Sequence, residues 1–294
     1  MTELKYRFTY DTLIKLLFVK YPDLLKRLVA AILGIAIDSI SEFLITNPEI
    51  PPEAIGNKFC KLDINMIVNG ERINLEVQVD NEGDYPERSL YYWARIYSSA
   101  LKTRQSYSSL PRVIIISIVD FTLFDCEEYR SEFLPLEVSR HEVLSNRMAM
   151  LYFEVKKLPK DIEAKNELEL MLSLFRAKTE EELKQLEALE VAVVTQAISA
   201  YREVMVSNEF RELERLRADA RHNEASALAN AERKADEKWQ GIVADKDAAH
   251  AVMLAEKDAA HTAMLVEKDA THAAMLADKD AEIARLRKQR EKRV

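Results

Sequence analysis

Asp63, Glu76 and Gln78 are the residues of this sequence whose types and spacing best suit chemistry. The segments on either side of Asn69-Gly70 alternate apolar and polar residues, and Asn-Gly is the strongest two-residue signal for a β-hairpin turn. Such a hairpin would place Asp63 directly opposite Glu76. Gln78 would share the face of Glu76, because strand residues two positions apart point the same way. We therefore expect two carboxylates and one amide on one face of a hairpin.

This pair of carboxylates admits two interpretations. Directly opposed residues in an antiparallel pair have Cβ atoms about 4.5–5.5 Å apart, and like charges at that separation destabilise the sheet. A hard divalent cation such as Mg²⁺, held by both acids, would remove the repulsion because it binds oxygen ligands. Alternatively, this face of the hairpin is solvated and the two acids turn apart into water.

The elements around the hairpin predict an α/β fold, in which a small domain has a mixed sheet flanked by helices. Helices are expected over residues 11–18, 22–34 and 88–106, and strands over residues 112–119, 132–138 and 148–155. Gly34 is a typical C-terminal stop for a helix, and Pro135 would confine its strand to a sheet edge. Residues 112–119 are a nearly unbroken β-branched run, which predicts a buried central strand.

The composition changes near residue 160, since all eight prolines lie before it and the chain beyond is mostly Ala, Leu, Glu, Lys and Arg. A segment without turn-forming residues predicts long helices. We expect three parts: the α/β domain over residues 1–160, a helical region over 161–244, and a coiled coil with a basic end over 245–294. The helical region should hold amphipathic helices over 163–175 and 180–210.

The last part contains an 11-residue repeat, with the copies DKDAAHAVMLA, EKDAAHTAMLV and EKDATHAAMLA over residues 245–277 and a degraded copy from Asp278. Eleven residues in three helical turns predict a slightly right-handed coiled coil. Leu254, Leu265 and Leu276 form its thin apolar seam. A helix of this kind cannot bury the seam within one copy, so we expect a homo-oligomer.

The overall composition limits the class of protein. The chain has 294 residues and a formal net charge of −8, from 42 Lys+Arg and 50 Asp+Glu. A generally basic nucleic-acid coat is excluded, so any DNA contact must come from a local patch. Cys60 and Cys126 are too few for a disulfide framework. No apolar run approaches the roughly 20 residues that cross a bilayer, and the first residues are not of signal-peptide type. We expect a cytoplasmic protein that does not enter the membrane.

Several segments resemble the recombination-promoting nuclease and transposase group of the PD-(D/E)XK nuclease superfamily. They are YDTLIKLLF over residues 10–18, Asp63 followed by EVQ over 76–78, PERSLYY over 86–92, Gln105, and LPRVIII over 110–116. The resemblance covers roughly residues 8–155 and leaves the repeat outside. The superfamily usually has Lys at the position of Gln78, whereas the group resembled here has Gln.

The resemblance implies a PD-(D/E)XK-like fold and Mg²⁺-dependent hydrolysis of a DNA phosphodiester bond. Asp63 and Glu76 would hold the metal, with the Val77 carbonyl as a further ligand, and Gln78 would orient the attacking water. Asp11 could add a ligand from the first helix. It could equally be an acid that is simply favourable at a helix N-terminus.

Basic residues near these acids are candidates for DNA contacts. Arg88 could meet a phosphate, or it could cap its helix or pair with a neighbouring acid. Lys15 or Lys61 could supply the positive charge that Gln78 lacks.

Other residues admit a functional and a structural role. Tyr91 and Tyr92 could stack on bases, or they could belong to the core. His250, His261 and His272 lie roughly 16 Å apart along one helix, so one chain cannot bring them to one metal ion. They could meet in layers of an oligomer, or they could be solvated.

Two functions follow from this sequence. The first is a metal-dependent DNA endonuclease, and it is favoured because Asp63, Glu76 and Gln78 are all present. The second is a catalytically weak or inactive nuclease fold that serves as a binding module on an oligomerising coiled-coil stalk.

Overall fold

The computed structural model describes residues 2–46, 49–50, 60–61, 64–101, 104–161, 163–164 and 166–291. The chain divides into two compact units, Met1–Arg217 and Ala218–Val294. Helix α7 (Asn208–Glu291) begins in the first unit and makes up the described part of the second. The boundaries expected at residues 160 and 244 stay a prediction.

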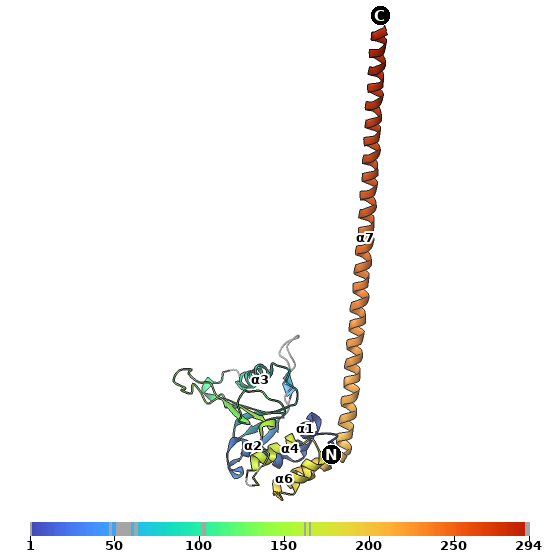
Figure 1. Ribbon diagram of the computed structural model, residues 1–294. Coiled ribbons are helices and arrows are strands. Elements are labelled where there is room, and N and C mark those ends of the chain that lie inside the picture. The colour runs from blue at the N-terminus through green and yellow to red at the C-terminus, as the bar shows by residue number, and fades with distance from the viewer. Residues whose placement is uncertain are drawn as a thin grey trace. The chain divides into compact units, whose positions relative to one another are not determined.

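A mixed six-stranded sheet lies at the centre of the first unit (Figure 1). Its strands follow the order β1-β4-β5-β6-β8-β7, with β1 Phe43–Thr46, β4 Ile64–Val68, β5 Glu71–Gln78, β6 Val113–Val119, β7 Arg130–Phe133 and β8 Met148–Glu154. The three inner strands β5, β6 and β8 run parallel, and the other pairs are antiparallel. Strands β2 (Glu49–Ile50) and β3 (Cys60–Lys61) form a separate two-stranded sheet. The expected α/β class is confirmed.

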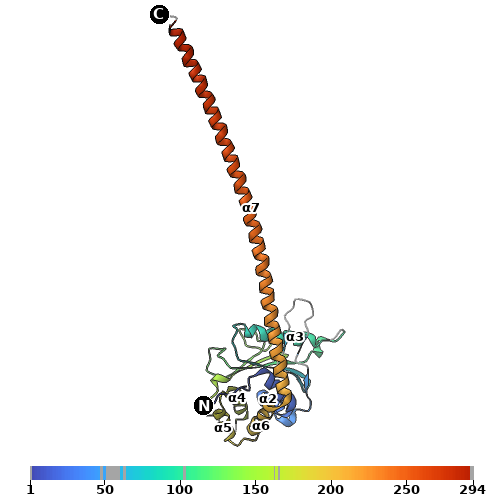
Figure 2. The same ribbon diagram turned by 90° about the vertical axis from the view of Figure 1, so that its right-hand side faces the viewer.

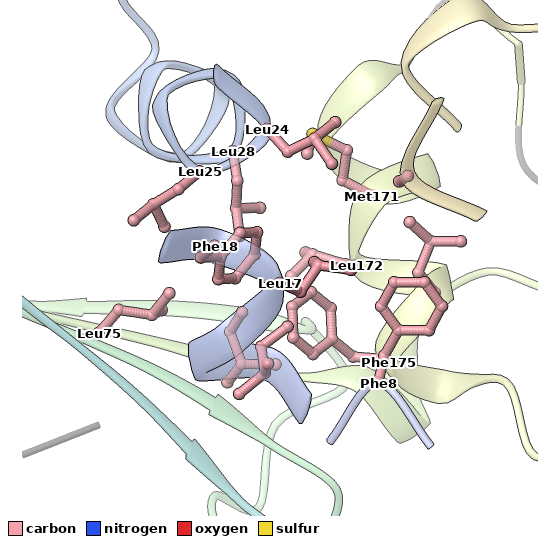
Figure 3. Close-up of a cluster of buried hydrophobic side chains, with 14 of the residues drawn as sticks. Phe8, Leu17, Phe18, Leu24, Leu25, Leu28, Leu75, Met171, Leu172 and Phe175 are labelled. Atoms are coloured by element: carbon pink, nitrogen blue, oxygen red, sulfur yellow. The ribbon is translucent and has the colours of Figure 1, made fainter. Parts of the chain in front are cut away.

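Helices from both ends of the first unit cover the same face of the sheet (Figure 2). They are α1 Asp11–Lys20, α2 Pro22–Leu33, α4 Glu167–Arg176 and α6 Ala192–Val206, with α5 Glu180–Glu187 beside them. Their buried side chains meet in one core, where Phe18 and Leu28 from the first helices approach Leu172 and Phe175 of α4 over Leu75 of the sheet (Figure 3). Each fully buried side chain of this size contributes about 1.5–3 kcal/mol.

Helix α3 (Tyr85–Ser99) covers the opposite face of the sheet. A smaller hydrophobic core lies beneath it. Its members include Tyr85 and Ile96 of α3, Val113, Ile115 and Val119 of β6, and Tyr152 of β8. The remaining short elements are the 3₁₀ helices η1 Ile37–Ser39, η2 Tyr107–Ser109 and η3 Val155–Lys157.

Most element boundaries agree with the expected ones, and Gly34 ends α2 in the left-handed conformation at φ 67°. The expected helix over 180–210 is wrong as a single element, because three helices replace it. The chain turns between α5 and α6 at Glu190, whose φ is 54°. It turns again at Ser207, whose hydroxyl accepts the Phe210 N–H. Helix α3 ends at Ser99 rather than near residue 106.

Among the helices that the structure describes, none combines the length and the apolar character needed to span a membrane.

Candidate active site

The Asn69-Gly70 hairpin has the predicted register. Ile64 lies opposite Leu75 and Met66 lies opposite Ile73. Asn69 and Gly70 both have positive φ, 47° and 80°, as a type I′ turn requires. The hairpin therefore fixes the faces of β5, and Glu76 and Gln78 lie on one face with Val77 on the other.

The face that carries Glu76 is the one that α3 covers. Glu76 lies beside Ser117 in the parallel pairing of β5 with β6. Ser117 shares its face with Ile115 and Val119, which belong to the core beneath α3. The Glu76 side chain is consequently buried, at 5% exposed. The interpretation in which both acids turn into water is therefore wrong for Glu76, because central parallel strands are buried on both faces.

A row of polar side chains crosses the sheet under α3. Glu76, Ser117 and Tyr152 are paired positions on β5, β6 and β8, and neighbouring strands lie about 4.8 Å apart. Ser117 is fully buried, and its Oγ has no hydrogen-bond partner among the described residues. The same is true of Asn74 Oδ1, two residues before Glu76. Burying such atoms without a partner costs about 1–3 kcal/mol each.

Tyr152, at the β8 end of this row, is held in place by a hydrogen bond to α3. Its hydroxyl lies 2.5 Å from Ser89 Oγ of α3. Burial raises the pKa of Tyr152, and the hydrogen bond with Ser89 opposes that rise. The phenol is therefore neutral over the physiological range and holds α3 against the sheet.

Gln78 lies where β5 ends. Its Nε2 donates to the carbonyl oxygen of Asp80 at 3.1 Å, and its own backbone oxygen accepts the Asp120 N–H at 2.9 Å. The amide is oriented by the loop that follows its own strand. Gln78 is partly exposed, so it lies at the accessible end of the face that carries Glu76.

Arg88 lies in the first turns of α3, directly after that loop. Its Nη1 contacts Glu82 Oε2 at 2.9 Å, and its guanidinium lies 5.0 Å from the centre of the Tyr85 ring. Arg88 pairs with an acid of the loop that joins β5 to α3. The two tyrosines that were candidates for stacking on bases differ in burial. Tyr91 is exposed, and Tyr92 packs against the core beneath α3.

Asp11 and Lys15 lie on α1 and form an ion pair one turn apart, with Nζ 2.8 Å from Oδ1. The buried residues of α1 belong to the core on the other face of the sheet. The buried side of α1 therefore packs on the face of the sheet opposite to the one that carries Glu76, and Asp11 and Lys15 are not among its buried residues.

The described pairing of the hairpin begins at Ile64, opposite Leu75. Residues Cys60–Lys61 form β3, in which Lys61 pairs with Glu49 of β2. The expected placement of Lys61 opposite Gln78 stays a prediction, because residues 62 and 63 lie outside the described residues. Asp63 lies outside the described residues, so its position opposite Glu76 stays a prediction.

Two buried acids, at the carboxyl ends of β6 and β8, were not among the residues expected from the sequence. Asp120 follows β6, is 6% exposed, and binds Arg7 with an Oδ2–Nη1 distance of 2.8 Å. Arg7 also donates to the carbonyl oxygens of Phe175 and Ala177, where α4 ends. This contact joins residues far apart in the sequence, and no local pattern reveals it.

Glu154 at the end of β8 is a second buried acid. It accepts the Leu123 N–H and pairs with Lys157 at 2.8 Å. Burial would lower the pKa of Lys157, but its hydrogen bond to Glu154 and the charge of that carboxylate raise it overall. This pair fixes the loop after β6, and it has a structural role.

Ser117 is the one missed residue that had a visible signal in the sequence, as the single polar residue of the run VIIISIV. A hydroxyl within a buried β-branched strand must meet a partner from another element or a bound group.

The donors on this face are oxygen atoms. They are the Glu76 carboxylate, the Ser117 hydroxyl and the Gln78 amide oxygen, and hard divalent cations prefer such ligands. Within the described ranges, no group of three His, Cys, Asp or Glu side chains is placed to hold a metal ion. The donor chemistry fits a divalent cation, and the second expected acid, Asp63, lies outside those ranges.

These features are those of an α/β protein with a buried acid and a polar side chain two residues later on one central strand. The model of one protein family, described as PD-(D/E)XK nuclease family transposase, matches residues 9–231. The chain belongs to this family. It is a nuclease/transposase-like protein, its family implies DNA as the substrate, and PD-(D/E)XK nucleases generally use divalent metal ions. Comparisons with curated proteins and with solved structures found no match.

The family match extends well beyond residue 155, where the resemblance in the sequence ended. The added part contains α4, α5 and α6, whose buried residues complete the core under α1 and α2. Its sequence is a generic amphipathic pattern without site motifs, so no motif comparison could include it.

Proposed function

We propose that this protein is a Mg²⁺-dependent DNA endonuclease that hydrolyses phosphodiester bonds. The observation that carries the proposal is the burial of Glu76 on a central strand, with Gln78 on the same face where that strand ends. A divalent cation would find an oxygen ligand in this carboxylate, and hard cations prefer such ligands.

The roles of the residues follow from their atoms. Asp63 and Glu76 would hold the metal, with the Val77 carbonyl as a third ligand. The bound metal would polarise the phosphoryl oxygen and lower the pKa of a water. Gln78 donates through Nε2 to its own loop, so its Oε1 is the atom that would accept a hydrogen bond from the attacking water and orient it. Asp11 is a further acid for the site.

Arg88, Lys15 and Lys61 are proposed to contact the DNA backbone. Arg88 is the best placed, because its partner Glu82 is mostly exposed, and an exposed ion pair contributes only about 0–1 kcal/mol. Exchanging that partner for a phosphate would cost little and would bring DNA next to Gln78.

Copies of the chain are proposed to associate through the repeat over residues 245–294, as a coiled coil. A DNA substrate agrees with the cytoplasmic location expected above. The second candidate function is a weak or inactive nuclease fold that binds DNA on an oligomerising stalk. Gln78 favours it, because an amide lacks the positive charge of the usual Lys.

Supercoiled plasmid with Mg²⁺ tests the two functions. We expect nicking or linearisation by the wild-type protein, and its loss with EDTA, in Asp63→Asn and in Glu76→Gln. Each lost ligand should lower the rate by at least about 100-fold, the scale of removing one charge-stabilising group. The matched control is Glu71→Gln, an acid at the other end of β5 that pairs with Arg112, and it should cleave as the wild type does.

Cleavage that survives in Asp63→Asn and Glu76→Gln would contradict this site. DNA binding without cleavage by the wild-type protein, in a gel-shift assay with and without Mg²⁺, would favour the binding module.

A further inference from the structure

The second unit has an apolar stripe that nothing in the described chain covers. Every side chain described between residues 225 and 288 is exposed. The exposed apolar residues include Val243, Leu254, Leu265 and Leu276, one every 11 residues. An exposed stripe along a helix of this length is typical of an association surface.

The residues beside the stripe follow from the repeat. Eleven residues per three turns rotate each residue by about 98°. Around the helix axis, Asp269 is then rotated by about 33° from Leu265 in one direction, and His261 by about 33° in the other. The seam therefore reads Leu, Asp, His in repeating order, with spacings of four, three and four residues. Its centre is not purely apolar, because two polar layers separate successive Leu layers.

The polar layers distinguish the two ways in which a second copy could bind. In a parallel in-register pair each residue meets its own copy, so Asp faces Asp and His faces His in every repeat. Opposed like charges in a partly buried layer are unfavourable. An antiparallel pair reverses the order of Asp and His in one copy, so that every Asp layer meets a His layer.

One antiparallel register satisfies all three repeats. Leu254 meets the partner's Leu265, and Val243 meets the partner's Leu276. Asp258 then meets the partner's His261. The remaining polar layers are Asp247 with the partner's His272 and Asp269 with the partner's His250. All of these residues are exposed in the single copy and are available for pairing.

We infer that two copies of this chain pair antiparallel along residues 243–276, with two Asp–His layers between successive apolar layers. The paired segment is about 50 Å long at 1.5 Å per residue. This inference rests on the proposed self-association of the repeat and is independent of the nuclease activity. The occupant of the seam is a second copy, because only the reversed repeat supplies His to every Asp.

Association is tested first, on the full-length protein, by light scattering over a range of concentrations. We expect a dimer whose Kd rises at least about tenfold in Leu265→Asp, since about 1.4 kcal/mol is tenfold. The matched control is Val252→Asp, which introduces the same residue on the opposite side of the helix and should change the Kd less than twofold. A monomer at all concentrations would overturn both the self-association and the pairing.

Orientation is tested by cysteine cross-linking in a Cys60→Ser, Cys126→Ser background. A disulfide needs Cα atoms about 4.4–6.8 Å apart. We expect a mixture of Leu254→Cys and Leu265→Cys chains, one with a larger tag, to form the mixed disulfide. Leu276→Cys alone should form none, and Glu256→Cys on the opposite side is the negative control.

A parallel coil would instead make Leu276→Cys cross-link with itself. A dimer in the light-scattering measurement together with that cross-link would retain the self-association and overturn the antiparallel pairing.

Discussion

At the residue scale, Ser117 is the side chain that most needs an explanation. It is fully buried, lies beside Glu76, and has an Oγ without a hydrogen-bond partner in the described part of the chain. A buried hydroxyl of this kind costs free energy, and an Ala of similar size would avoid the cost. The proposed metal site explains it, because the hydroxyl can bind a metal-bound water or hold the Glu76 carboxylate in place.

Ser117→Ala tests this role with two measurements. We expect Mg²⁺ or Mn²⁺ affinity, by titration calorimetry, to fall about three- to tenfold, the scale of one hydrogen bond. The free energy of unfolding in urea should stay the same or rise, because no existing hydrogen bond is lost. Ser173→Ala is the matched control, since that buried hydroxyl donates to the Glu169 carbonyl at 2.8 Å. It should lower stability and leave metal affinity unchanged. Unchanged affinity in Ser117→Ala would show that Ser117 is only a packing residue.

At the element scale, the hairpin that carries Glu76 is tied to the segment before β1 through its turn. Asn69 Oδ1 accepts the backbone N–H groups of Ser41 and Glu42 at 2.9 and 3.1 Å. Asn69 Nδ2 donates to the Ser39 carbonyl at 3.0 Å, and the Gly70 N–H donates to Glu42 Oε2. Asn69 therefore forms the type I′ turn and also aligns β1 beside β4.

Asn69→Gly separates the role of Asn69 in the turn from its role in aligning β1. Gly tolerates the positive φ of the turn but has no side chain to bind the 39–42 segment. We expect the free energy of unfolding in urea to fall by about 1–3 kcal/mol. Asn81→Gly is the control, since Asn81 makes one local bond to the Gly83 N–H in an exposed loop. Equal losses in the two variants would mean that Asn69 acts only through the entropy of the unfolded chain.

At the scale of the whole molecule, the core of the first unit is complete without the repeat. Helices α4 and α6 supply its last layer, and the first unit ends at Arg217. The repeat over residues 245–277 therefore lies outside this core, which agrees with its proposed role in association. Its phase should matter more than its length, because the stripe must stay on one side of the helix.

Two deletions test the phase. Deleting 267–277 removes one complete repeat and keeps the remaining Leu, Asp and His in line, so we expect a dimer by light scattering. Deleting 267–271 rotates the following residues by about 130°, and we expect a monomer or a much weaker dimer from this smaller deletion. The thermal midpoint of the first unit should be the same in both. Equal association of the two would contradict the coiled coil.

Local rules in the sequence determined several features of this protein. Asn69-Gly70 set the hairpin register, Gly34 ended α2, and the β-branched run set β6, because turn chemistry and side-chain periodicity act over a few residues. The 11-residue repeat determined the stripe on α7 for the same reason. The family resemblance came from short motifs within the first half of the chain.

Only the tertiary structure decided the surroundings of those residues. The parallel pairing of β5 with β6 buried Glu76 and brought Ser117 beside it, and the docking of α4 and α6 completed the core from sequence that has no motif. The ion pair of Arg7 with Asp120 and the pairing of β3 with β2 were likewise decided only by the tertiary structure. All of these depend on contacts between distant segments, whose free energy comes from burying surfaces together, and no local pattern encodes which surfaces meet.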